Sequence, residues 1–195
     1  MEEGNVANGS KAGDASTTPR RCWQGFPTQW LWGHRCGWPG EEAGVTSGAF
    51  YKYFDSKSDA FREAIVDGML RLKEGVLRFQ KQHGKQWWEH FVPFYLHERR
   101  TCELSASCVL PSLTEEVVRS DESSRVAFET ELREIAAIVA SGPKSPDAPD
   151  DVESAYASLA TLLGGVTLAR AVNDPRLANC IASSVERVLL PHRRK

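Results

Sequence analysis

The sequence predicts an all-α protein, and three observations support this fold class. Apolar residues recur at helical spacing along most of the chain after residue 41, the alternation typical of strands is missing there, and helix-start signals precede the periodic segments. Ser56 and Asp59 form such a signal, an S-x-x-D capping pattern. One helix face then carries Phe61, Ile65, Met69, Leu72, Val76 and Phe79. This helix is expected to end at His83-Gly84.

Three further long helices are predicted, over about residues 121–140, 151–172 and 175–190. The last one begins with Asp174-Pro175, an N-cap followed by proline at the first helical position, where proline is well tolerated. Residues 141–149 form a loop with three prolines, and 102–108 form a less regular connection. The aromatic segment after residue 86 contains Pro93, which predicts a kink or a helix start.

Composition limits the classes of protein to which the chain can belong. It has 195 residues, 41% of them hydrophobic, and a formal net charge of −2, which fits one or two globular domains. No stretch approaches the roughly 18 consecutive apolar residues of a membrane-spanning helix, and the polar start of the chain is unlike a secretory signal. We therefore expect a cytoplasmic protein with no membrane partner. Its five scattered cysteines are expected to be free thiols.

The first forty residues differ from the rest of the chain. Residues 1–20 are polar and small without a hydrophobic period, so we expect a disordered tail. Residues 21–40 form an anomalous segment that holds four of the six tryptophans, two cysteines and four glycines. Cys22, His34 and Cys36 offer three zinc ligands there, but their spacing matches no common zinc finger and a fourth ligand is missing. We expect no metal, no cofactor and no catalytic activity.

A motif directly after this segment carries the functional prediction. Residues 43–61 read A-G-V-T-S-G-A-F-Y-K-Y-F-D-S-K-S-D-A-F, which strongly resembles the turn, the recognition helix and the start of the next helix in the TetR family of bacterial transcriptional regulators. The resemblance implies that residues 41–60 are the remainder of a helix-turn-helix DNA-binding domain. Residues 61–195 would then form a helical effector-binding and dimerisation domain. The implied function is a repressor that a small-molecule effector releases from DNA.

The resemblance implies DNA contacts at seven positions. Phosphates are expected to be held by Thr46, Tyr51, Tyr53 and Lys57, and base edges lie nearest to Ser47, Gly48 and Lys52. A two-fold dimer would present its recognition helices about 34–36 Å apart to a palindromic double-stranded operator. The alternative for the aromatic residues is an ordinary core position, and for Lys57 a solvated charge.

Two further sets of residues follow from the same resemblance. The effector pocket is expected to contain Trp88, Phe91, Tyr95, Cys108 and Leu110, and the alternative is an aromatic core at helical spacing. The homodimer interface is expected to contain Leu159, Leu163, Gly164, Val166, Ala169, Ile181 and Val185. Small residues in this set permit close approach of helices across a two-fold axis.

The chain departs from the family pattern over residues 21–40. The family has two helices before the motif, and this segment matches neither of their patterns. Its Trp, Cys, Gly, Pro and Arg residues are typical of GC-rich DNA read in the wrong frame, so we hypothesise a compensated pair of frame changes around it. If the sequence stands as written, the recognition helix lacks the helices that brace it, and short isolated helices are marginal in water. The alternative function is then a helical effector-binding dimer that has lost specific DNA binding.

Overall fold

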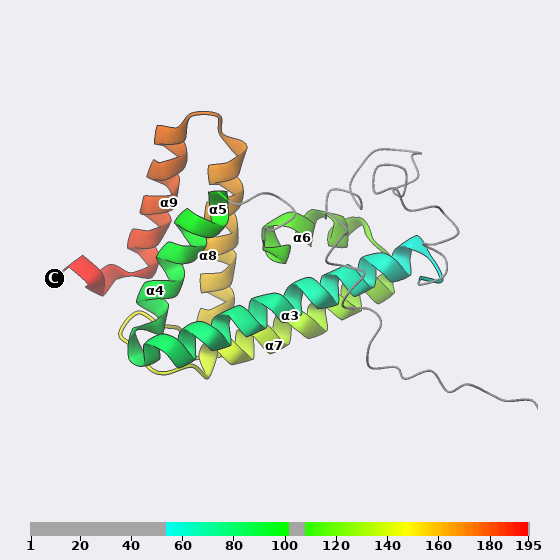
Figure 1. Cartoon of the computed structure of the whole chain (residues 1–195), viewed down its shortest axis with the longest axis horizontal. Helices are drawn as coiled ribbons and strands as arrows, with labels where there is room; N and C mark the ends of the chain where they lie inside the picture. The colour runs from blue at the N-terminus through cyan, green and yellow to red at the C-terminus, as the bar shows by residue number, and fades with distance from the viewer. Residues whose placement is uncertain (1–53, 102–107, 195) are drawn as a thin grey trace, which may run out of the picture. The chain divides into compact units, whose positions relative to one another are not determined.

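The computed structural model describes residues 54–101 and 108–194, and every regular element among them is a helix (Figure 1). The elements are α3 (Lys57–His83), η3 (Gly84–Gln86), α4 (Trp87–Pro93), η4 (Phe94–Glu98), α5 (Arg99–Thr101), α6 (Val109–Arg119), α7 (Glu122–Ala140), α8 (Val152–Ala171), α9 (Pro175–Leu189) and η6 (Pro191–Arg194). The all-α prediction is confirmed for this part of the chain. The predicted tail, the segment 21–40 and residues 41–53 lie outside the described residues.

The long helices begin where the sequence predicts, at the predicted caps Ser56 and Asp174 and at two further capping residues close to the predicted starts. The hydroxyl of Ser56 accepts a hydrogen bond at 3.0 Å from the backbone N–H three residues later and starts α3. Asp151 accepts in the same way at 2.7 Å and starts α8. Asp121 and Asp174 cap α7 and α9. Because these oxygens satisfy N–H groups that have no partner inside the helix, each cap contributes about 1 kcal/mol of stability.

Helix α6 is a difference between the structure and the sequence prediction, because the sequence pattern predicts no helix over residues 109–119. Its buried residues Val109, Leu110, Leu113 and Val117 lie along one side of the helix. Pro111 obscures the pattern, but it occupies the third helical position, where a backbone N–H would have no intrahelical partner. A proline in this first turn therefore does not interrupt α6.

Pro93 changes the type of helix without ending the helical segment. It is the last residue of α4, and Phe94–Glu98 after it form the π turn η4 before α5 begins. Proline has no N–H to donate, and its ring crowds the preceding turn. A single π turn is one known form of such an irregularity in a helix. The predicted kink thus takes the form of a local π turn.

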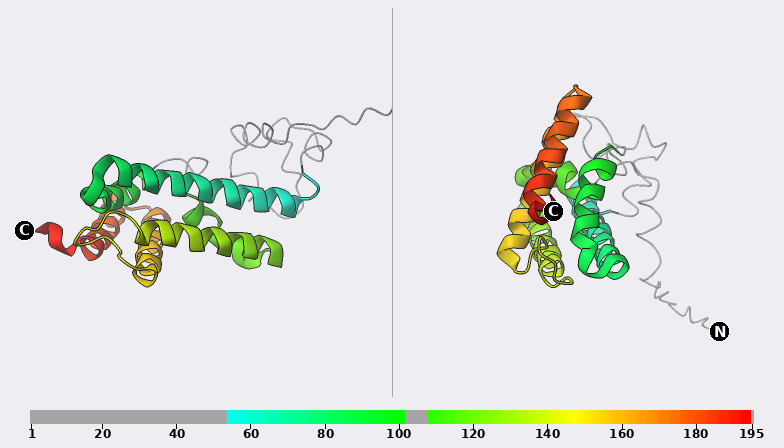
Figure 2. Two further views of the ribbon diagram at one scale, coloured as in Figure 1. Left: turned by 90° about the horizontal axis from the view of Figure 1, so that it is seen from below. Right: turned by 90° about the vertical axis from the view of Figure 1, so that its left-hand side faces the viewer.

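Helices α3 and α7 lie side by side and run in the same direction (Figures 1 and 2). Polar contacts join Ser58 to Asp121, Lys73 to Glu134 and Gln80 to Ile138. The residue numbers of the partners increase together, as they do when two helices are parallel. The largest fully buried apolar side chains of the pair are Ile65, Met69 and Val76 on α3 and Ile135 and Val139 on α7. Burial of each such side chain is worth about 1.5–3 kcal/mol, so this pair supplies a large part of the core.

Helices α8 and α9 form a second pair (Figure 1). They approach closely at Gly165, where an added Cβ would lie 2.9 Å from Cγ2 of Val185. By length and composition alone α8 is the one described helix that is apolar enough to cross a membrane, a test that core helices of folded domains also pass. Because α8 packs against α6, α7 and α9, one side of this helix belongs to the core of the chain.

A glycine sets the distance between α3 and α6. Gly68 lies in the middle of α3, and a Cβ there would be 2.7 Å from both Cβ and Cγ2 of Val109, the first residue of α6. Glycine in a helix interior costs about 1 kcal/mol relative to alanine, so the close approach of α6 is the structural reason for this residue. Gly75, further along α3, has no neighbouring atom within 4 Å of such a Cβ.

We expect Gly68→Ala to lower the free energy of unfolding by about 1–3 kcal/mol, because the new methyl group forces Val109 and α6 to shift. Gly75→Ala is the matched control, since it adds the same group to the same helix without a contact, and it should raise the stability by about 0.5–1 kcal/mol. Urea unfolding followed by circular dichroism measures both changes. Equal stabilisation by the two substitutions would contradict the role assigned to Gly68.

Candidate functional site

The predicted DNA-binding residues fall at the edge of the described structure. Outside the described residues lie Thr46, Ser47, Gly48, Tyr51, Lys52 and Tyr53. Lys57 is described: it is the first residue of α3 and is exposed to solvent. The structure therefore describes one of the seven predicted residues, which lies at the N-terminus of α3 and within the last residues of the motif.

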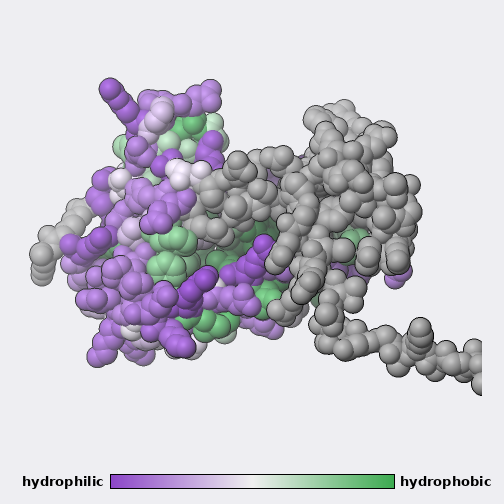
Figure 3. Space-filling view, viewed as in Figure 1, coloured by the Kyte–Doolittle hydropathy of each residue, from purple (hydrophilic) through white to green (hydrophobic). Residues whose placement is uncertain are grey.

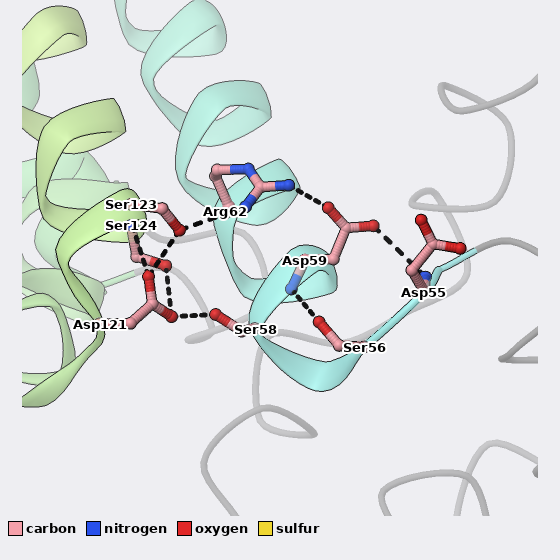
Figure 4. Close-up of polar contacts among 8 residues, drawn as sticks. All are labelled: Asp55, Ser56, Ser58, Asp59, Arg62, Asp121, Ser123 and Ser124. Atoms are coloured by element: carbon pink, nitrogen blue, oxygen red, sulfur yellow. Dashed lines mark hydrogen bonds and ion pairs between the residues drawn. The ribbon is translucent and has the colours of Figure 1, made fainter.

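A network of hydrogen bonds holds the start of α3 and reaches across to α7 (Figure 4). Asp121, the N-cap of α7, accepts hydrogen bonds from the hydroxyl of Ser58 and, at 2.6 Å, from the hydroxyl of Ser123. Arg62 donates to the carboxylate of Asp59 and, at 3.3 Å, to the hydroxyl of Ser123. Side-chain hydrogen bonds thus join the first turns of the two helices.

These contacts lower the pKa of Asp121. Hydrogen bonds from the hydroxyls of Ser123 and Ser58 and from the backbone N–H of Ser124 all favour the ionised carboxylate, so its pKa lies far below the ordinary value. A carboxyl group with a lowered pKa contributes stability above its unfolded pKa and loses it as the pH falls through the folded pKa. The carboxylate of Asp121 therefore stays ionised at neutral and mildly acidic pH.

A cluster of aromatic rings on α3, α4 and η4 contains three of the predicted effector-pocket residues. Trp88, Phe91 and Tyr95 are buried, and successive ring centroids lie 5.8 and 5.7 Å apart. The indole N–H of Trp88 donates to the carbonyl of Leu189 at 3.3 Å, and Phe79 meets Phe91 edge-on at 5.5 Å. The cluster therefore joins α4 to α3 and α9. This arrangement agrees with the alternative that these residues form an aromatic core.

The other two predicted pocket residues, Cys108 and Leu110, lie at the start of α6 and are buried. The next turn holds Ser112, whose hydroxyl is buried without a hydrogen-bond partner. A buried hydroxyl without a partner costs about 1–3 kcal/mol, so a polar ligand atom at this position would be favourable. Sequence reasoning missed Ser112, because a serine on a helix carries no signal of how its hydroxyl is satisfied.

A buried ion pair lies between α3 and α7. The ammonium group of Lys73 is 2.7 Å from a carboxylate oxygen of Glu131 and 2.6 Å from one of Glu134. The side chains of Lys73 and Glu131 are 11% and 13% exposed, whereas that of Glu134 is 56% exposed. Burial opposes the charged form of Lys73, but the hydrogen bonds to both glutamates outweigh it, so the lysine pKa is raised. No sequence pattern marks Lys73 for this role.

The predicted dimer residues divide into two groups. Buried within the single chain are Leu159, Val166 and Ala169. Partly exposed are Leu163, Gly164, Ile181 and Val185. A partner subunit would reach only the second group, because the side chains of the first group are already covered. Helical periodicity finds the apolar stripe of α8, and the folded chain uses much of that stripe for its own core.

Other apolar residues of the same two helices are exposed. Leu168 on α8 and Leu177 and Val188 on α9 are 61%, 46% and 69% exposed. Figure 3 shows hydrophobic residues among hydrophilic ones near the connection between α8 and α9. Only a third of the most apolar window of α8 is buried within the chain. The sequence does contain a signal for this exposed face. Ala160, Gly164 and Leu168 are spaced four residues apart, so two small residues and one large apolar residue share one side of α8.

The described residues show no group of three or more His, Cys, Asp and Glu side chains that would hold a metal ion. Cys22, His34 and Cys36 lie outside this part of the chain. The cysteines of the described part, Cys108 and Cys180, form no disulfide, and the first is buried whereas the second is exposed.

Comparison with solved structures identifies the fold. Neither a known protein-family profile nor a curated protein matches the chain. The structure of NemR from E. coli in its reduced form matches with a TM-score of 0.63 and 16% identity over 85% of this chain and 94% of that one. A TetR-family transcriptional regulator from Agrobacterium tumefaciens matches with a TM-score of 0.66 and 14% identity over 87% and 95%. The chain therefore has the all-α fold of TetR-family regulators.

The two glutamates that contact Lys73 give a matched test of the buried ion pair. Glu131→Gln removes the buried one of the two charges that compensate the lysine and should cost about 3 kcal/mol of stability, the lower end for buried pairs, because Glu134 still contacts the ammonium group. Glu134→Gln changes an exposed partner and should cost less than about 1 kcal/mol. Urea unfolding at pH 7 measures both, and equal losses would show that burial does not distinguish the two contacts.

Proposed function

We propose that this chain is a TetR-like transcriptional regulator that works in the cytoplasm as a homodimer and responds to a small-molecule effector. The observation that carries the proposal is the junction at α3. The first described helix of a TetR-like fold begins at Lys57, within the last residues of the motif that resembles the family's recognition helix. Both the fold and the motif support the proposal, because the motif lies directly before and at the start of this helix.

In this proposal the DNA contacts are Thr46, Ser47, Gly48, Tyr51, Lys52, Tyr53 and Lys57. The exposed position of Lys57 at the N-terminus of α3 supports its part in the proposal. Backbone N–H groups at a helix N-terminus favour a phosphate, and a lysine side chain adds charge to the same place. The regulator acts as a repressor on a palindromic operator, and the effector releases it.

The effector of this proposal is a small, mainly apolar molecule with at least one polar group. Tyr95, Cys108 and Leu110 contact it, and Trp88 and Phe91 form the rigid aromatic support behind them. The hydroxyl of Ser112, which lacks a hydrogen-bond partner, supports the polar group. Pockets of this composition, apolar with a few polar groups that fix orientation, are the usual form of small-molecule sites.

The dimer of this proposal pairs the exposed faces of α8 and α9 with those of a second copy. The contact residues are Leu163, Gly164, Leu168, Leu177, Ile181, Val185 and Val188. The support is that α8, the most apolar of the described helices, has only a third of its most apolar window buried in a single copy. A symmetric interface brings the same patch together on both subunits, and Gly164, with no atom near its Cβ position, leaves room for a partner helix.

A second candidate function follows from residues 21–40. Because this segment lacks the pattern of the two helices that brace a recognition helix, the chain as written acts as an effector-binding dimer without specific DNA binding. Such a dimer would poison an intact relative by mixing subunits. Resequencing of codons 15 to 45 separates the two candidates, since a restored frame would return the bracing helices.

The dimer interface is tested by Leu168→Asp, which places a charge in the proposed contact and should convert the dimer to monomers. Val118→Asp is the matched control, because Val118 is 70% exposed on α6 and lies outside the proposed interface. Sedimentation velocity measures the oligomeric state of the wild type and both variants. A wild-type monomer, or an intact Leu168→Asp dimer, would contradict the proposed interface.

DNA binding is tested by selection from a random duplex pool, followed by mobility shifts at several salt concentrations. A chain with a restored frame is expected to enrich a palindrome, and Lys57→Ala should weaken its binding to all sequences and lower the salt slope by about one. Lys85→Ala, an exposed lysine of η3, should leave binding unchanged. The chain as written is expected to bind weakly or not at all, and tight sequence-specific binding by it would exclude the second candidate.

A further inference from the structure

The residues that precede α3 are bound to its first turn by two hydrogen bonds (Figure 4). The backbone N–H of Asp55 donates to the carboxylate of Asp59 at 3.4 Å, and the N–H of Asp59 donates to the hydroxyl of Ser56 at 3.0 Å. This reciprocal arrangement resembles a capping box, in which two side chains satisfy backbone donors at a helix start. The direction in which the chain enters α3 therefore depends on the position of Asp59.

Asp59 is itself held from α7. One arm of the Arg62 guanidinium donates to the carboxylate of Asp59, and the other donates to the hydroxyl of Ser123 at 3.3 Å. Ser123 in turn donates to one oxygen of Asp121 at 2.6 Å, and Ser58 donates to the other. Two routes from the first turn of α3 thus converge on the carboxylate of Asp121.

Apolar packing does little to hold this turn. Among residues 56–60 only Ala60 is buried, and a methyl group contributes much less than a Leu or Ile side chain. Further along α3 the situation is reversed, because Ile65 and Met69 are fully buried and Lys73 pairs with α7. The orientation of the first turn therefore rests on its polar contacts, whereas the rest of α3 is fixed by the core.

We propose that Asp121 anchors an orientation latch that fixes how the chain enters α3. The latch consists of Asp55, Ser56, Ser58, Asp59, Arg62, Asp121 and Ser123. When it is closed, residues 55–59 have one orientation relative to α7. When it opens, the first turn of α3 moves while the helix beyond Lys73 stays in place. The latch is a conformational device of the helical unit, and its existence does not depend on what the preceding residues bind.

Hydrogen exchange of the full chain, measured by mass spectrometry, tests the latch. Asp121→Ser keeps a good N-cap for α7 but removes the carboxylate that accepts from both Ser58 and Ser123. Exchange in the peptide that covers residues 55–62 should become roughly three- to tenfold faster, as expected for the loss of one or two hydrogen bonds. Peptides from α3 beyond Lys73 should be unchanged.

Asp151→Ser is the matched control. Asp151 also caps a helix and has a lowered pKa, and its hydrogen bonds are with Ser154 of its own helix. It should leave the 55–62 peptide unchanged. Ser58→Ala should accelerate exchange there, and its combination with Asp121→Ser should be no faster than Asp121→Ser alone, because both act through one carboxylate.

Four results would overturn the latch. They are unchanged exchange of residues 55–62 in Asp121→Ser, equal acceleration in Asp151→Ser, a wild-type 55–62 peptide that exchanges like an unprotected chain, and acceleration over the whole of α3. The last result would show loss of the helix instead of release of its first turn. If Asp121→Ser fails to fold, Ser58→Ala replaces it in the test. This substitution leaves every helix cap in place, and unchanged exchange of residues 55–62 in it would also contradict the latch.

Discussion

The parallel packing of α3 against α7 is the constraint on which the rest of the described structure depends. At about 1.5 Å per residue, the 27 residues of α3 span about 40 Å, and along this length the helix packs against α7, α4, α6 and η3. Its middle accepts α6 at Gly68, and its last turns carry Phe79 against the aromatic cluster and Gln80 against the end of α7. A shift of α3 along α7 would disturb all of these contacts together.

Polar contacts add to the register that the apolar packing of the two helices sets. Lys73 and Glu131 form a buried pair in the middle of the interface, and a buried charge without its partner is costly. Any other register would separate the lysine from its glutamates. The pair therefore favours the observed alignment of the two helices.

The aromatic cluster connects the two helix pairs. Trp87 donates to the carbonyl of Pro143 at 3.0 Å, and Trp88 donates to the carbonyl of Leu189, so α4 is fastened both to the proline-rich loop and to the end of α9. A second link follows the chain through α6. This helix begins beside the proposed effector residue Cys108 and ends two residues before Asp121. Helix α6 thus connects residues of the proposed sensor to Asp121, the N-cap of α7 that anchors the latch.

The sequence by itself determined the fold class and the starts of the long helices. Caps and helical periodicity are local, since a capping side chain and its N–H lie within three residues of each other, and Ser56, Asp121, Asp151 and Asp174 were all predictable for this reason. Helix α6 was not predicted, because Pro111 interrupts the local sequence pattern. In the structure Pro111 lies in the first turn of the helix, where a proline is tolerated. The motif that indicates DNA binding is likewise a local string, and it lies outside the described residues.

Only the tertiary structure decided which apolar residues are covered and which polar residues meet. Leu159 and Leu168 belong to the same helix, and whether each faces its own chain or solvent depends on where α6, α7 and α9 pack. The partners Ser58 and Asp121 are separated by 63 residues, as Lys73 and Glu134 are by 61. Such contacts depend on how two helices align in space, and no pattern within either helix specifies that alignment.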